Sequence, residues 1–350
     1  MPLELIDSNG LVSVRTDADV KALRDDGFAR TIHLDANIAL DLSRVGAGKS
    51  GTIDTVVGDL LQLAVSTDTA VDYDLAVEEL ATGAAHATGD LTRASTLRRD
   101  INSGIRLVET HLGLQRGSVC IGHIGPREVA SYNNVHLGYY THLLRIEQIA
   151  KTRPGRAAAV DNMSEYIRWA NEELKSVVAH CLQVALDIFG GEPRAARLLG
   201  ITSSKTQHSR AWNAAWDLVH AYAMQCETSR QVGHTMKRAL LATRDRALSY
   251  VAQRCVVAIY VRDSPIGDTT LVRHRIDQPF FVDRNGEVTT LIAEVFASQR
   301  RRIERSDVLT RRSLLRMRDE LEKELHIEPS ARSDARPCSR AGADRASFEG

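Results

Sequence analysis

Four acidic residues stand where metal-dependent chemistry could be carried out: Asp35, Glu79, Asp217 and Asp245. Asp35 directly follows an apolar run at residues 31–34, and Asp245 falls shortly after a second run at residues 239–242. The other two acids lie on segments with helical character. In an open parallel sheet, the carboxyl ends of the strands and the adjoining helix starts share one edge, where ligands bind. We therefore expect the four carboxylates to meet at that edge.

Four carboxylates in one place favour a bound divalent cation. Their ionised forms repel one another, and they are tolerable together only if a cation neutralises them. Oxygen ligands with open positions suit Mg²⁺ or Mn²⁺, which keep waters and bridge to phosphate oxygens. A cation held in this way lowers the pKa of a bound water and stabilises charge on a scissile phosphate. The structural alternative is that aspartates cap helices, with Asp217 a polar residue on a helix surface.

The pattern of apolar residues predicts an α/β fold. Short apolar runs predict buried strands at residues 31–34, 239–242 and 256–261. Helical spacing predicts helices over residues 55–64, 74–82, 162–189, 212–225 and 246–253. The order strand, helix, strand over residues 239–261 indicates a parallel arrangement. Farther along, Asn285-Gly286 predicts a hairpin within residues 280–290, and helical structure follows over residues 290–325.

Composition excludes several functional classes. The 350 residues carry 45 basic and 45 acidic side chains, so the formal net charge is zero. A protein that coats nucleic acid by bulk charge needs a positive excess, which this chain lacks. The five cysteines have no CxxC spacing and predict neither a zinc site nor a disulfide framework. No apolar run approaches the ~20 residues of a membrane span, and the start lacks the regions of a signal peptide, so we expect a cytoplasmic protein without membrane contacts.

Four short segments resemble the motifs of PIN-domain nucleases and occur in that family's order. TIHLDANIALDL is similar to the opening strand followed by Asp-x-Asn, and AVEELATG is similar to the second motif. AWDLVHAYAM resembles the third motif, and LLATRDRALSYVA resembles the fourth, with Thr-Arg-Asp before a helix. The resemblance covers residues 30–90 and 205–262. It implies a three-layer α/β/α core with a central parallel sheet.

The resemblance also implies roles for individual residues. The implied ligands of Mg²⁺ or Mn²⁺, directly or through water, are Asp35, Glu79, Asp217 and Asp245. Glu78 adjoins Glu79 and is the alternative ligand, because the two side chains face about 100° apart on a helix. Asn37 would orient Asp35 or touch the phosphate, and Thr243 would hydrogen-bond the same cluster. For Asn37 and Thr243 the alternative is a capping or turn role.

The activity implied by the resemblance is metal-assisted hydrolysis of a phosphodiester, with water as the nucleophile. We expect an endoribonuclease with RNA as the substrate, and DNA is the alternative. Enzymes of this family often act as toxins or defence effectors.

The spacing of the motifs predicts an insertion. Glu79 and Asp217 are 138 residues apart, which is much farther than in a minimal PIN domain. We expect four parts: a discontinuous core at residues 1–90 and 205–265, a helical insertion at 91–204, a hairpin and helical extension at 266–327, and a disordered tail at 328–350. The insertion or the C-terminal helix could hold a protein partner or a second copy of the chain.

Arginines crowd the segment that precedes the tail: Arg300, Arg301, Arg302, Arg305, Arg311, Arg312, Arg316 and Arg318. Arginines at three- and four-residue offsets can track a phosphate backbone, and we assign nucleic-acid binding to the first four. The alternative is a solvated helix face or an oligomer contact that pairs with the acidic stretch DELEKEL.

Two other functions compete with the nuclease. A phosphatase that resembles haloacid dehalogenases also starts from a strand that ends in aspartate, which there acts as the nucleophile. That family has a second aspartate two residues later, where this chain has Asn37. The other competitor is a catalytically inactive PIN-like module that binds proteins.

Overall fold

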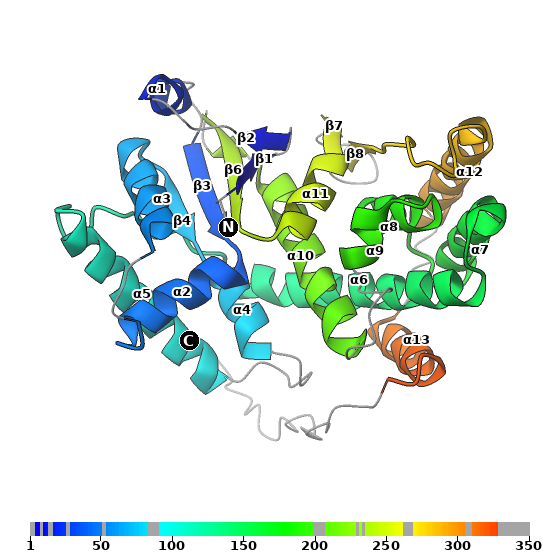
Figure 1. Cartoon of the computed structure of the whole chain (residues 1–350), viewed down its shortest axis with the longest axis horizontal. Coiled ribbons are helices and arrows are strands. Elements are labelled where there is room, and N and C mark those ends of the chain that lie inside the picture. Colours follow the sequence, from blue (N-terminus) through cyan, green and yellow to red (C-terminus); the bar gives the residue numbers. More distant parts are fainter. Residues whose placement is uncertain are drawn as a thin grey trace, which may run out of the picture.

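An open sheet lies beside a large group of helices in the computed structural model (Figure 1). The structure describes residues 4–7, 10–12, 17–25, 29–50, 54–82, 91–198, 207–228, 231–232, 235–261, 269–304 and 310–327. The strands of the main sheet are β1 (Glu4–Asp7), β2 (Gly10–Val12), β3 (Ala29–Leu34), β4 (Ala70–Asp72), β5 (Gln231–Val232) and β6 (Thr235–Thr243). They confirm an α/β fold.

The centre of this sheet is parallel and its edges are antiparallel. The strand order is β2-β1-β6-β3-β4, and β5 pairs with β6. β3 runs parallel to both of its neighbours, β4 and β6. β1, β2 and β5 pair antiparallel. The sheet is therefore mixed, and β3 lies between two parallel partners.

Alternate side chains of the central strands face two helical layers, as the two-residue repeat of a strand requires. Ile32 and Leu34 pack against α2 (Ala36–Gly46), α3 (Thr55–Ser66), α4 (Asp74–Thr82) and α5 (Leu91–His111). Ala239 and Leu241 face the opposite layer, formed by α10 (Gln207–Thr228) and α11 (Arg246–Arg254). α1 (Asp17–Asp25) follows β2.

The remaining helices form what we call the helical part. They are α6 (Pro126–Thr152), α7 (Ala159–Glu172), α8 (Ala179–Phe189), α9 (Pro193–Leu198), α12 (Asn285–Glu304) and α13 (Arg311–Glu324). Their buried cluster includes Tyr140 and Tyr166, and α10 adds Trp212 and Trp216 to it. No described helix is long and apolar enough to span a bilayer. α10 therefore packs both against the sheet and against the helical part.

Three predicted elements differ from the structure. The single helix expected over residues 162–189 is wrong, because Lys175 takes a left-handed φ of 56° and the chain breaks into α7 and α8. β7 (Val256–Val261) does not join the parallel sheet but pairs antiparallel with β8 (Thr269–Arg273). The hairpin expected over residues 280–290 is also wrong: a turn leads directly into α12.

The turn before α12 has a tertiary cause. The amide of Phe280 donates to the carbonyl oxygen of Gly190 at 2.8 Å, which holds this segment against the end of α8. Asn285 and Gly286 then begin a helix instead of closing a hairpin. The helical prediction over residues 290–325 is confirmed for α12 and α13, between which residues 305–309 are not described. The predicted disordered tail lies outside the described residues.

α5, which we assigned from sequence to the insertion, packs with the α/β core. Ile101, Ile105 and Val108 share one buried cluster with Ile32 and Leu42. The contact between α5 and α2 is close because Gly104 has no side chain: a Cβ there would overlap the carbonyl oxygen of Leu42. A glycine is therefore needed where these two helices cross.

We predict that Gly104→Ala lowers the free energy of unfolding by about 2 kcal/mol or more, because α5 must move away from α2. Gly138 in α6 is the matched control, since a Cβ there meets nothing within 4 Å. Gly138→Ala should raise the free energy of unfolding by about 0.5–1 kcal/mol through helix propensity. Urea unfolding of both variants measures the difference, and equal effects would contradict the close contact.

A buried charged cluster lies between the sheet and α10. The Nε2 atom of His33 on β3 is hydrogen-bonded to Glu227 on α10, and Nδ1 lies 3.9 Å from Oδ1 of Asp72 on β4. Burial lowers the pKa of His33, but the carboxylates of Asp72 and Glu227 outweigh it and raise the pKa to about 9. His33 is therefore a cation that ties β3 to β4 and to α10 at neutral pH.

This cluster predicts a pH dependence of stability. Because the pKa of His33 is raised in the folded state, its contribution is complete below about 6.5 and is lost as the pH rises through about 9. The contribution amounts to roughly 3 kcal/mol. In Glu227→Gln the loss between pH 6.5 and 9 should be much smaller than in the wild type, whereas Glu294→Gln on the exposed side of α12 should match the wild type. Equal pH slopes for all three proteins in urea unfolding would contradict the assignment.

Candidate active site

Asp35 lies at the carboxyl end of β3, where the chain enters α2. It is buried and caps this helix: Oδ1 accepts from the amide of Ile38 at 3.0 Å. Oδ2 accepts from Oγ1 of Thr243 at 2.5 Å and from the amide of Arg244 at 3.3 Å. The register of the parallel pair explains this, because Leu34 lies opposite Ala242 and so brings Asp35 next to Thr243. The carboxylate is held by groups from both strands.

Thr243 also orients the second acid at this edge. Its Oγ1 atom accepts from the amide of Asp245 at 2.9 Å while donating to Asp35. Asp245 in turn accepts from the amide of Leu248 through Oδ1 at 3.3 Å, at the start of α11. One threonine hydroxyl therefore orders two carboxylates at the ends of β3 and β6.

Asp217 completes the acidic group from the opposite layer. It lies on α10 and is only partly exposed. Burial raises its pKa well above the ordinary value, and the negative charges of Asp245, Glu79 and Asp35 raise it further. The structure thus places Asp35, Glu79 and Asp245 within electrostatic range of Asp217, although these acids are far apart in the sequence.

Glu79 lies on α4 and has a partner that the sequence did not reveal. Nε2 of His220 lies 3.1 Å from Oε2 of Glu79, and the histidine side chain is only 1% exposed. Nδ1 of His220 is buried with no hydrogen-bond partner among the described residues. His220 follows Asp217 by three residues on α10, so both side chains lie on one helix face. That spacing was the available sign of its role.

The neighbouring acid, Glu78, is directed elsewhere. Nδ2 of Asn133 on α6 donates to Oε1 of Glu78 at 2.8 Å. Of these two adjacent acids, Glu79 is the one whose negative charge acts on Asp217. This geometry favours Glu79 over Glu78 as the member of the acidic group.

Other sequence-predicted residues lie outside this group. The Asn37 side chain is exposed on the first turn of α2, and Asp35 is oriented by Thr243 and backbone amides. The side chains of Arg300, Arg301 and Arg302 on α12 are not described, and Arg305 lies outside the described residues. On α13, Arg316 and Arg318 pair with acids of the same helix, Glu320 and Asp319. These ion pairs within one helix agree with the alternative that the arginines form a solvated helix face.

The chemistry of the donors fits a hard divalent cation. All four acids offer oxygen ligands. Burial and the negative charges of the other three acids raise the pKa of Asp217. A cation would relieve this repulsion. Among the described residues, no group of three or more His, Cys, Asp or Glu side chains is already close enough to hold an ion.

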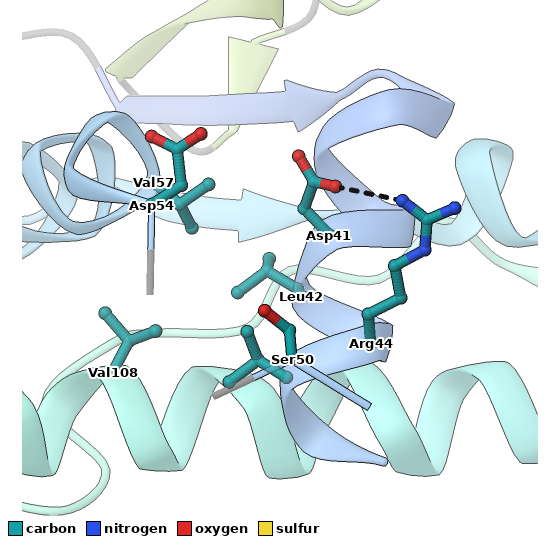
Figure 2. A pocket seen from close by; sticks show the side chains of 8 residues that line it. Asp41, Leu42, Arg44, Ser50, Asp54, Val57 and Val108 are labelled. Atoms are coloured by element: carbon teal, nitrogen blue, oxygen red, sulfur yellow. Dashed lines mark ion pairs between the residues drawn. The ribbon is translucent and has the colours of Figure 1, made fainter. Parts of the chain in front are cut away.

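A pocket of about 320 Å³ lies between α2, α3 and α5 (Figure 2). Leu42, Val57 and Val108 line it together with the acids Asp41 and Asp54. Arg244 pairs with both acids at 2.8 Å, through Nη1 to Asp41 and Nη2 to Asp54. The backbone amide of Arg244 donates a hydrogen bond to Asp35. Arg244 therefore links the pocket to the four carboxylates.

We predict that Asp217→Asn raises the free energy of unfolding in EDTA at pH 8 by about 1 kcal/mol or more, because a desolvated carboxylate beside other negative charges is costly. The wild type should lose stability relative to this variant as the pH rises above about 4, since the pKa of Asp217 is raised in the folded state. Asp59→Asn on the exposed side of α3 is the control and should change little. A less stable Asp217→Asn protein would show that the carboxylate is well satisfied.

Comparisons with known proteins provide no relative for this site. No family model matches the chain. No curated protein matches it, and no solved structure matches it. The functional interpretation therefore depends on the residues and geometry described above.

Proposed function

We propose that this chain is a metal-dependent nuclease of the PIN type that cleaves RNA as an endoribonuclease. The observation that carries the proposal is the group of four carboxylates, delivered by four separate elements to the carboxyl edge of two parallel strands. Open α/β sheets bind ligands at this edge. A fold gains nothing in stability from such an arrangement, so a function for it is expected.

The topology around the acids supports a PIN-like core. Asp35 ends a strand with parallel partners on both sides, and helical layers cover both faces of the sheet. Thr243 ends the neighbouring strand, and Arg244 and Asp245 then lead into α11. Helices α6 to α9 lie between α4 and α10 in the chain, where the motif spacing requires an insertion.

In the proposed site Asp35, Glu79, Asp217 and Asp245 hold Mg²⁺ or Mn²⁺. The ion, when bound, would make an attacking water more acidic and offset charge on the phosphate. Thr243 keeps Asp35 and Asp245 in register, and His220 positions Glu79 by its hydrogen bond. These residues act on the ligands and need no contact with RNA. A role as a toxin or defence effector follows from the family resemblance alone.

The phosphatase alternative lacks one of the residues that it needs. Asn37 stands where that family would have its second aspartate. The inactive protein-binding module is retained as an outcome of the experiment below.

The test is cleavage of labelled RNA and DNA with Mn²⁺ by the wild type, Asp35→Asn and Asp245→Asn. Either substitution should slow RNA cleavage by about a hundredfold or more, because each removes a carboxylate worth several kcal/mol of transition-state stabilisation through the ion. Asparagine still caps a helix, so Asp35→Asn should fold. Asp59→Asn should cleave as the wild type does.

Three results would contradict the proposal. Cleavage that persists in both variants would place the chemistry elsewhere. Faster cleavage of DNA than of RNA would overturn the substrate assignment. Absence of cleavage by the wild type, with or without hydrolysis of small phosphate esters, would leave the phosphatase or the inactive module as the better interpretation.

A further inference from the structure

A groove of about 610 Å³ runs along the outward face of α5, apart from the acidic site. Three arginines and three neutral polar residues line it: Arg99, Arg106, Arg116, Asn102, Ser103 and Thr110. We propose that this α5 groove binds the phosphate backbone of single-stranded RNA at a distance from the cleavage site. The inference deepens the proposed nuclease function and rests on it.

The α5 groove is positively charged at its surface. Within the described part of the chain, no carboxylate lines it. Arg106 does pair with Glu109, but Glu109 is fully buried and also accepts from the amides of Gly117 and Val119. The carboxylate of Glu109 therefore lies beneath the groove, while the Arg106 side chain lines it. Arg99 pairs with Asp100 and its side chain is still 73% exposed.

Arg116 brings a third charge from outside the helix. It lies in the loop after α5, which Glu109 holds through the two amides. It is exposed and has no ion pair or hydrogen bond among the described residues. The loop thus sets a guanidinium beside those of the helix, ready for an anion.

The dimensions of the α5 groove favour a polymer over a single phosphate. Arg99 and Arg106 are two helical turns apart, or about 10 Å along the axis. Asn102, Ser103 and Thr110 supply amide and hydroxyl groups, which commonly contact phosphates and sugars. Leu107 also lines the groove and is 48% exposed, so it offers a base an apolar surface. Unpaired RNA presents all of these groups together.

The α5 groove and the acidic site lie on opposite sides of a helix contact. Gly104, on the inner face of α5, packs against Leu42 of α2, and Asp35 caps that same α2 helix. A strand in the groove therefore contacts the protein away from its scissile bond. Long RNA should benefit from the groove, whereas an oligonucleotide too short to span both places should not.

The experiment measures binding of a fluorescein-labelled single-stranded RNA by anisotropy in EDTA, where no cleavage occurs. The Arg99→Ala/Arg116→Ala double variant should bind about tenfold or more weakly, and the slope of log K against log salt should fall by about 1.4 because two phosphate contacts are lost. Arg168→Ala, an exposed arginine on α7, is the matched control and should bind as the wild type does.

Cleavage separates this inference from the proposed function. With Mn²⁺ the double variant should cleave a tetranucleotide at the wild-type rate and long RNA more slowly. If the protein cleaves no substrate while RNA binding still depends on Arg99 and Arg116, the nuclease proposal is contradicted and the groove assignment still holds. The groove assignment is overturned if the wild type does not bind RNA, if the double variant binds like Arg168→Ala, or if poly-glutamate displaces RNA at equal concentration.

Discussion

The hydrogen bond between Thr243 and Asp35 is the constraint around which the site is built. It joins the carboxyl ends of two neighbouring parallel strands. The same hydroxyl accepts a hydrogen bond from the backbone amide of Asp245. The positions of two acids are therefore set by strand register rather than by flexible side chains. α4 and α10 then need only approach this edge for Glu79 and Asp217 to complete the group.

The crowding of these acids works against folding, and the rest of the molecule offsets it. The sheet buries Ile32 and Leu34 on one face and Ala239 and Leu241 on the other. A salt-bridged His33 stabilises the same sheet from within. Proteins commonly tolerate a local electrostatic cost where function requires it, and elsewhere follow the usual rules of burial and pairing.

Much of the core could be predicted because local patterns and tertiary structure agree there. The strand before Asp35, the helix over residues 74–82 and the helix that starts at Arg246 lie where their apolar spacing places them. The apolar run at residues 256–261 predicts the strand but not its partner: β7 pairs antiparallel with β8, the next strand along the chain, instead of joining β6. The break at Lys175 carries no glycine or proline, so the sequence had no mark for it. The role of His220 is hard to infer from the sequence, because its three-residue spacing from Asp217 is the only sign and a buried histidine on an apolar helix usually has a packing role. In the structure its 3.1 Å contact with Glu79 distinguishes it.

α10 has a consequence for how the site can be controlled. Its first turns place Trp212 and Trp216 in the core of the helical part, and its later turns place Ala221 and Met224 against the sheet. Asp217 lies between these two regions on the same helix. Trp216 and Asp217 are adjacent on this helix, so a molecule that displaces Trp216 would also displace the Asp217 carboxylate. If the acidic group binds a cation as proposed, its affinity for the cation and the affinity of the helical part for such a molecule depend on each other by thermodynamic reciprocity.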